Sequence, residues 1–251
     1  MSAAPAPSPW QPAPMELRAS SEQVDVWRCD LQRVGDEAGL LRWLSPLEQG
    51  RAEEYRVASK RREFIVGRSM MRLVLAKLTG REPLDVSFAY EPKGKPQLDA
   101  SCNTGEITFN LSHSRGMIVM ATAARRAVGI DVECVRERFS FEKLAERFFS
   151  PREVTALMSV PEAQRMRAFY RCWTRKEAYL KAMGLGITVA LDSFDTVFWP
   201  AREARIDASR DEPEAPQKWA MNDLPLGTEH VGTVAAEGPI KVMRCWSFTP
   251  A

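Results

Sequence analysis

Two carboxylates stand two residues apart in an otherwise apolar run, at Asp131 and Glu133 in the segment VGIDVE. In a β-strand, residues i and i+2 point to the same face, so the two carboxylates would lie side by side. Carboxylates held this close repel each other unless a cation lies between them, and hard oxygen ligands suit Mg²⁺. The pair therefore predicts a divalent metal site, although two solvated acids on an exposed strand would give the same pattern.

A second group of charged side chains lies in a stretch whose apolar residues have helical spacing. Trp173, Glu177 and Lys181 stand at positions i, i+4 and i+8, so they share one face of that helix. Glu177 is a candidate third metal carboxylate, and Lys181, one turn later, would face an anion held by the metal. An ordinary Glu–Lys helix pair is the alternative interpretation, because such pairs are common.

Polar side chains also end an expected strand, in the segment NLSHS at 110–114. The hydroxyl of Ser112 and the imidazole of His113 could bind phosphate oxygens there, although a lone histidine is more often structural. The turn GKP at 94–96 presents Lys95 as a further cation. Such turns are usually solvated loops, so this signal gains meaning only in combination with the others.

The elements that carry these residues repeat along the chain. A serine N-cap, a proline and a glutamate at the third helical position form a capping box at 45–48, and the same signal returns 105 positions later at 150–153. Apolar residues at helical spacing follow each box, and Gly80 and Gly184 supply the expected helix ends. Each half is therefore expected to contain a short capped helix and a long helix.

The repeat predicts an α+β fold with two related halves. With a slip of one residue, the run at 25–27 aligns with 131–133, and only the second half carries two acids on this strand. We expect a disordered proline-rich leader at 1–14, an N-terminal half at 15–115 and a C-terminal half at 116–251. Chance similarity of two capping boxes is the alternative to a true repeat.

The composition of the 251 residues sets further limits. With 45% hydrophobic and 27% charged residues the chain can form a packed core, and no run approaches the ~18 apolar residues of a membrane span. The net charge of +2 argues against bulk attraction to nucleic acid or membranes, and five cysteines without a CxxC pair argue against disulfides and thiolate zinc. We therefore expect a cytoplasmic protein. Its basic surface should be local, at 51–81, a segment that contains nine basic and three acidic residues.

Five segments together resemble one family of enzymes. They are GKP at 94–96, FNLSHS at 109–114, VGIDVE at 128–133, RFFSPRE at 147–153 and WTRKEAYLKAMGLG at 173–186. In order and spacing they are similar to the 4′-phosphopantetheinyl transferases of the surfactin-synthetase-activating type. The resemblance implies a pseudodimer of two similar α/β halves with the active site between them, and two related halves agree with the repeat. It also implies transfer of the 4′-phosphopantetheine arm of coenzyme A to a carrier-protein serine, with release of 3′,5′-ADP.

The resemblance implies roles for the candidate residues as well. Three carboxylates would bind Mg²⁺ on the coenzyme A pyrophosphate: Asp131, Glu133 and Glu177. Lys181 would stabilise or protonate the leaving phosphate, and Glu153 would be the base that takes the serine proton, although its place in the helix also fits a purely structural cap. Contacts to coenzyme A would come from Asp131, Lys176, Lys181, Lys95, Ser112 and His113, with Arg62 as first and Arg56 as second choice for its 3′-phosphate. A solvated helix face is the alternative for either arginine.

The same resemblance implies the partners. The substrates would be coenzyme A and an apo acyl or peptidyl carrier protein, and the basic run at 51–81 complements the acidic surface that carriers usually present. A chain with two halves would act as a monomer, without nucleic acid or membrane. A catalytically inactive protein that binds carriers or coenzyme A is the alternative function. Nucleic-acid binding would need a basic surface without the carboxylate triad.

Overall fold

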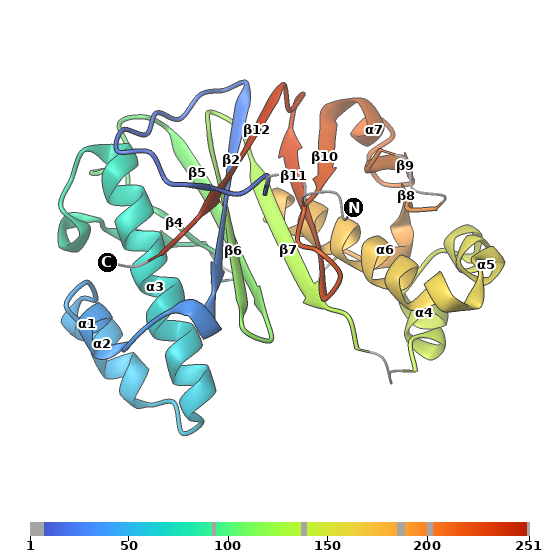
Figure 1. Ribbon diagram of the computed structural model, residues 1–251. Coiled ribbons are helices and arrows are strands. Elements are labelled where there is room, and N and C mark those ends of the chain that lie inside the picture. Colours follow the sequence, from blue (N-terminus) through green and yellow to red (C-terminus); the bar gives the residue numbers. More distant parts are fainter. Residues whose placement is uncertain (1–7, 92–93, 137–139, 185–188, 200–202, 250–251) are drawn as a thin grey trace, which may run out of the picture.

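The protein is built of four layers, with a long helix outside each of two central sheets (Figure 1). The computed structural model describes residues 8–91, 94–136, 140–184, 189–199 and 203–249. Helix α3 packs on one sheet and α6 on the other, and the two sheets pack face to face between them. In this part of the chain, no helix combines the length and the apolarity that crossing a membrane would require.

The first sheet has the strand order β1-β12-β2-β6-β5, in which β12 runs parallel to β2 and the β2-β6-β5 part is antiparallel. The second sheet has the order β10-β11-β7 and is antiparallel throughout. The bounds of these strands are Gln11–Pro12 for β1, Gln23–Asp30 for β2, Ile107–Ser114 for β5, Met117–Ala124 for β6, Val128–Cys134 for β7, Trp219–Asp223 for β10, His230–Glu237 for β11 and Val242–Ser247 for β12.

Helices cover the outer face of each sheet, and a short hairpin lies beside each long helix. The helices are α1 (Ala38–Leu41), α2 (Pro46–Glu53), α3 (Ala58–Thr79), α4 (Glu142–Phe148), α5 (Pro151–Ser159), α6 (Glu162–Met183) and α7 (Ala215–Lys218). The hairpins pair β3 (Phe88–Tyr90) with β4 (Pro96–Leu98) and β8 (Phe194–Val197) with β9 (Arg205–Ser209). Single-turn 3₁₀ helices lie at Leu31–Arg33, Pro83–Asp85 and Leu191–Ser193 among the described residues.

The two halves repeat the same plan, which confirms the expected α+β pseudodimer. Strands β2-β6-β5 correspond to β7-β11-β10, and α3 and α6 each have 22 residues. Both long helices end at a glycine with positive φ, 66° at Gly80 and 69° at Gly184, a conformation that costs glycine little. Both predicted capping boxes are formed in full, at the starts of α2 and α5.

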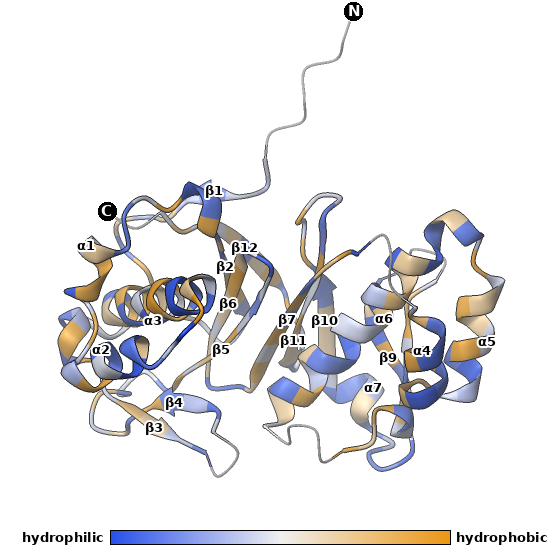
Figure 2. Ribbon diagram, turned by 90° about the horizontal axis from the view of Figure 1, so that it is seen from below, coloured by the Kyte–Doolittle hydropathy of each residue, from blue (hydrophilic) through white to orange (hydrophobic). Residues whose placement is uncertain are grey.

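Alternating residues divide each inner strand between two cores. Val24 and Val26 of β2, and Ile130 and Val132 of β7, point into the apolar layer between the sheets. The residues between them point outward, toward the helices. Figure 2 shows the apolar colouring concentrated on these central strands. This alternation is what places Asp131 on the α6 side of β7.

Two of the expected boundaries are corrected by the strand pairing. Of the leader expected at 1–14, residues 1–7 lie outside the described part, whereas Trp10 is buried and β1 pairs with β12. The boundary expected between 115 and 116 is also displaced, because β6 pairs with both β2 and β5 in the first sheet. Strand β12, from the end of the chain, completes that same sheet.

Strand β7 lies directly against the backbone of α6 at Gly129. A Cβ atom at this position would lie 2.2 Å from both the carbonyl oxygen of Ala178 and the amide nitrogen of Ala182. No side chain can occupy that space without moving the strand or the helix. A glycine is therefore required here for steric reasons, although its φ is not positive.

We predict that Gly129→Ala strongly destabilises the protein, because the added methyl group must push β7 away from α6. Overpacking of this kind typically costs about 1–3 kcal/mol, and contact with two backbone atoms places this case at the upper end. The matched control is Gly50→Ala in α2, where a Cβ would meet nothing within 4 Å. That change should stabilise the protein by about 0.5–1 kcal/mol. Urea unfolding of both variants measures the contrast, and equal stabilities would contradict the close approach.

Candidate active site

The three expected metal carboxylates come from two adjoining elements. Asp131 and Glu133 lie near the end of β7, and Glu177 lies on α6, which packs on that strand. Burial raises the pKa of Glu177, and the nearby negative charges of Asp131 and Glu133 add to the effect. Burial is also the main cause of the raised pKa of Glu133. The three carboxylates therefore form one interacting, partly desolvated group.

Lys181 balances part of this negative charge. Its Nζ atom lies 2.6 Å from Oδ1 of Asp131 and donates to the hydroxyl of Ser112 at 3.0 Å. Three residues that the sequence singles out, Lys181, Asp131 and Ser112, are thus in contact. The ammonium group lowers the pKa of Glu177 and of Glu133 and opposes the effect of burial. A cation at this position thus stabilises the ionised form of the group.

The donor chemistry of this group fits a hard divalent cation. All three side chains offer carboxylate oxygens, and Oδ2 of Asp131 is buried without a hydrogen-bond partner. Throughout the described ranges, no three His, Cys, Asp or Glu side chains already form a group that could hold a metal ion. An orphaned buried carboxylate oxygen is costly, and a bound cation would relieve that cost.

Strand β5 supplies the next row of polar groups. Its alternate residues reach across to β7: Asn110 Oδ1 accepts the backbone N–H of Ile130 at 2.9 Å, and Ser112 donates to Oδ1 of Asp131 at 2.9 Å. Two residues further, Ser114 donates to Oε2 of Glu133 at 2.8 Å. Because β5 and β7 are the edges of different sheets, these side chains join the two halves at the carboxylates.

A pocket of about 290 Å³ opens on the first half, beside β5. It combines aromatic rings with cationic groups; its lining includes Arg51, Tyr55, Lys60, Glu63, Phe64, Arg68, Tyr90 and His113. Arg68 is only 8% exposed, yet its Nη1 atom has no hydrogen-bond partner. His113 and Lys60 both contact Glu63, at 2.8 and 2.6 Å. Aromatic faces beside an unsatisfied guanidinium donor suit a planar ligand that carries negative charge.

The two arginines first expected to bind a phosphate do not line this pocket. The guanidinium of Arg62 donates to the carbonyl oxygens of Leu31, Val34 and Gly35, where it holds the loop after β2. Arg56 is exposed outside the pocket lining. The cations that do line it belong to the same basic run: Arg51, Lys60 and Arg68. The helical spacing of Lys60, Phe64 and Arg68 is a signal that could have placed these residues on one face.

Lys95 joins the halves and does not point into the pocket. Its Nζ donates to the carbonyl oxygen of Lys181 at 2.6 Å, near the end of α6, while its neighbours Gly94 and Pro96 line the pocket. Burial lowers the pKa of Lys95, and the nearby Glu91 opposes that shift. A cation is favourable at this end of a helix, so the contact stabilises the position of Lys181.

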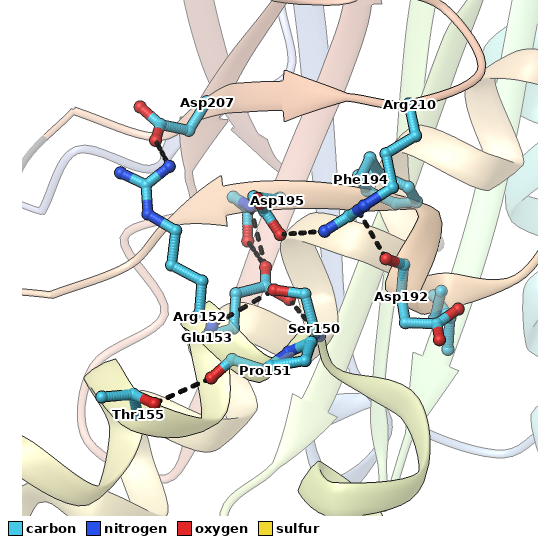
Figure 3. Close-up of polar contacts among 12 residues, drawn as sticks. Ser150, Pro151, Arg152, Glu153, Thr155, Asp192, Phe194, Asp195, Asp207 and Arg210 are labelled. Carbon is cyan, nitrogen blue, oxygen red and sulfur yellow. Dashed lines mark hydrogen bonds and ion pairs between the residues drawn. The ribbon is translucent and has the colours of Figure 1, made fainter.

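Glu153 and Lys176 form a buried ion pair away from the carboxylate group, which corrects two expected roles. Lys176 is fully buried and contacts Glu153 Oε2 at 2.7 Å, so it is not placed to bind a cofactor. Glu153 is 2% exposed; its Oε1 accepts from the backbone N–H of Thr196, and Oε2 accepts from that of Ser150. Figure 3 shows Glu153 beside Ser150, beneath the strand of Asp195. Glu153 therefore caps α5 and connects it to α6 and β8. In this position its carboxylate is not exposed to a substrate, as a general base would have to be.

Comparisons with known proteins identify one family. A family model described as "4'-phosphopantetheinyl transferase, N-terminal" matches residues 35–125, and one described as "4'-phosphopantetheinyl transferase superfamily" matches 127–235. The chain is 36% identical to the 4'-phosphopantetheinyl transferase HetI of Nostoc sp. over 91% of its length and 94% of that protein. It is 28% identical to Sfp of Bacillus subtilis over 61% of its length and 65% of that protein. The two models meet at the turn between β6 and β7.

We predict that Glu153→Gln lowers stability much more than activity. The amide leaves the buried ammonium of Lys176 without a counter-charge, which costs about 3–5 kcal/mol. At roughly 2–4 °C per kcal/mol for a chain of this size, the melting temperature should fall by about 6 °C or more. The kcat of the fraction that stays folded should remain within about tenfold of the wild type, well short of the loss expected for a general base.

A double variant provides the control for this prediction. Glu153→Leu with Lys176→Met removes both charges, so its melting temperature should exceed that of either single variant. A Glu153→Gln protein that melts like the wild type but loses about 100-fold or more in kcat would restore the role of base.

Proposed function

The chain belongs to the 4′-phosphopantetheinyl transferase superfamily, and we propose that it transfers the 4′-phosphopantetheine arm of coenzyme A to a serine of an apo acyl or peptidyl carrier protein. The observation that carries this proposal is one interacting group, made of Asp131, Glu133, Glu177 and Lys181, that strand β5 connects to a cationic, aromatic pocket. Strand β5 contributes His113 to the pocket and Ser112 to the carboxylate group. A ligand with a nucleotide at one end and a pyrophosphate next to it would span both.

The pocket would bind the nucleotide end of coenzyme A. Phe64 and Tyr55, whose rings lie 5.4 Å apart, offer apolar faces to the adenine. Arg68, Lys60 and His113 offer donors to the 3′-phosphate. Glu63 holds the side chains of Lys60 and His113 in place, so part of the ordering cost is met before the ligand binds.

The carboxylate group would act on the pyrophosphate. Asp131, Glu133 and Glu177 would hold Mg²⁺, which neutralises charge on the phosphate oxygens when it is bound. The carrier serine oxygen forms a bond to the phosphorus that bears the pantetheine arm, and the bond from that phosphorus to the 3′,5′-ADP oxygen breaks. Lys181 Nζ donates to the leaving phosphate. With Glu153 buried elsewhere, we assign the serine proton to the carboxylate of Glu177, which belongs to the same interacting group as Lys181.

The partners follow from the same proposal. Exposed basic residues around the pocket, such as Arg51 and Lys60, complement the acidic surface of a carrier protein. Both halves of the site come from one chain, which favours a monomer, and we expect it to act in the cytoplasm. Coenzyme A and the apo carrier are then the two substrates, with Mg²⁺ as the cofactor.

We predict that the purified protein, given coenzyme A and Mg²⁺, adds one phosphopantetheine arm to at least one member of a panel of apo carriers. Mass spectrometry of the intact carriers detects the addition, and EDTA should abolish it. Asp131→Asn should reduce the rate by at least about 100-fold, because it weakens a metal ligand and the partner of Lys181. If coenzyme A binds but no carrier gains mass, the protein is an inactive binding protein instead.

Asp25→Asn is the matched control for that experiment. Asp25 stands at the corresponding place on β2, but its carboxylate is bound by Arg244 and by the indole N–H of Trp246. This change should lower stability and leave the dependence on Mg²⁺ intact. A metal dependence that disappears equally in both variants would contradict the assignment of the metal to the second half.

We also predict that Lys60→Gln raises the KM for coenzyme A by about tenfold and leaves the KM for dephospho-coenzyme A unchanged, because it removes a charged donor for the 3′-phosphate. Arg62→Gln should change neither KM and should lower the melting temperature, since Arg62 bonds to backbone carbonyls. Steady-state kinetics with both substrates separates the two. The reverse result would assign the binding of the 3′-phosphate to Arg62 and contradict its binding in the pocket.

A further inference from the structure

We propose that Ser114 is a positioning residue that sets the orientation of the Glu133 carboxylate for the divalent cation. The inference rests on the proposed function, because it takes Glu133 to be a metal ligand. Ser114 belongs to the segment FNLSHS, but none of the roles assigned above uses it. It is the last residue of β5, directly beside the end of β7.

The hydroxyl of Ser114 has a fixed direction. Its Oγ accepts the backbone N–H of Cys134 at 3.1 Å and donates to Oε2 of Glu133 at 2.8 Å. A hydroxyl has one proton, and because the amide of Cys134 occupies an acceptor position, that proton points at the carboxylate. One oxygen of Glu133 is therefore held, and this fixes the direction in which the other oxygen, Oε1, points.

The backbone of Ser114 is held from the second half as well. Its carbonyl oxygen lies 3.3 Å from Nε2 of His230, a buried residue of β11. His230 pairs with Cys134 in the register of β11 and β7, so one point of the second sheet contacts both the main chain and the hydroxyl of Ser114. The serine is thus fixed relative to the strand that carries Glu133.

A comparison with Ser112 shows what this contact supplies. Ser112 bonds to Asp131 two residues earlier on both strands, but Asp131 is also held by Lys181 and is 4% exposed. Glu133 is less buried and has one more rotatable bond than an aspartate, so it has more freedom to lose when a metal binds. Orienting bonds of this type typically change metal affinity by about 10- to 100-fold.

The experiment measures metal binding directly. Mn²⁺ is titrated into the full chain with saturating coenzyme A, and free Mn²⁺ is followed by electron paramagnetic resonance. Ser114→Ala should weaken Mn²⁺ binding by about 10- to 100-fold, while Ser114→Thr, which keeps the hydroxyl, should restore most of the affinity. Thermal unfolding without metal should change by only a few degrees for Ser114→Ala, as expected for one lost hydrogen bond.

Thr108→Val is the control on the same strand. The hydroxyl of Thr108 donates to the backbone carbonyl of Arg126 at 2.6 Å, far along β5 from the carboxylates, so its loss should lower stability without changing Mn²⁺ affinity. If Ser114→Ala binds Mn²⁺ as the wild type does, or if Thr restores nothing, the positioning role is wrong and the proposed function stands. A wild-type protein that binds no Mn²⁺ overturns both the positioning role and the metal assignment.

Discussion

The close approach of β7 to α6 at Gly129 is the constraint on which the rest of the site depends. A Cβ atom here would lie 2.2 Å from backbone atoms of Ala178 and Ala182, so strand and helix are in direct backbone contact. The residues two and four positions after Gly129 point to the same side of β7 as Gly129. Those residues are Asp131 and Glu133, and the helix they face carries Glu177 and Lys181. One glycine therefore determines how closely the carboxylates of two elements can gather.

The site also depends on the contacts between the two halves. Strands β5 and β7 are edges of different sheets, and side chains join them: Asn110, Ser112 and Ser114 reach the backbone and the carboxylates of β7. Lys95 adds a contact from the first half to the end of α6. The same polar groups thus hold the halves together and orient the acids. For this reason the site needs both halves, although the three carboxylates proposed to hold the metal belong to the second.

The two halves have the same arrangement of helices and strands but carry different side chains on them. In each, the glutamate of a capping box pairs with a buried cation of the long helix, Glu48 with Arg72 and Glu153 with Lys176. The corresponding strands, β2 and β7, differ in their acidic residues. Asp25 is neutralised by Arg244, and the position two residues later holds a buried tryptophan, whereas Asp131 is followed by Glu133. The first half instead contains the cationic pocket. The different roles that we propose for the two halves rest on these differences.

The sequence by itself determined the main helices, their ends and the placement of Asp131 and Glu133 on one face of a strand. Capping boxes, helix-ending glycines and the same-face spacing of Asp131 and Glu133 are local features, because each depends on residues only a few positions apart. The role of Glu153, the cations of the pocket and the boundary between halves could not be read in this way. The local pattern predicts Glu153 as a helix cap, but packing also makes it the buried partner of Lys176. Arg62 bonds to backbone carbonyls some thirty positions away. Strand β12 joins the first sheet from the far end of the chain. Only the tertiary structure decided these points, because burial and long-range pairing determine which charged groups are free to meet a ligand and which hold the fold together.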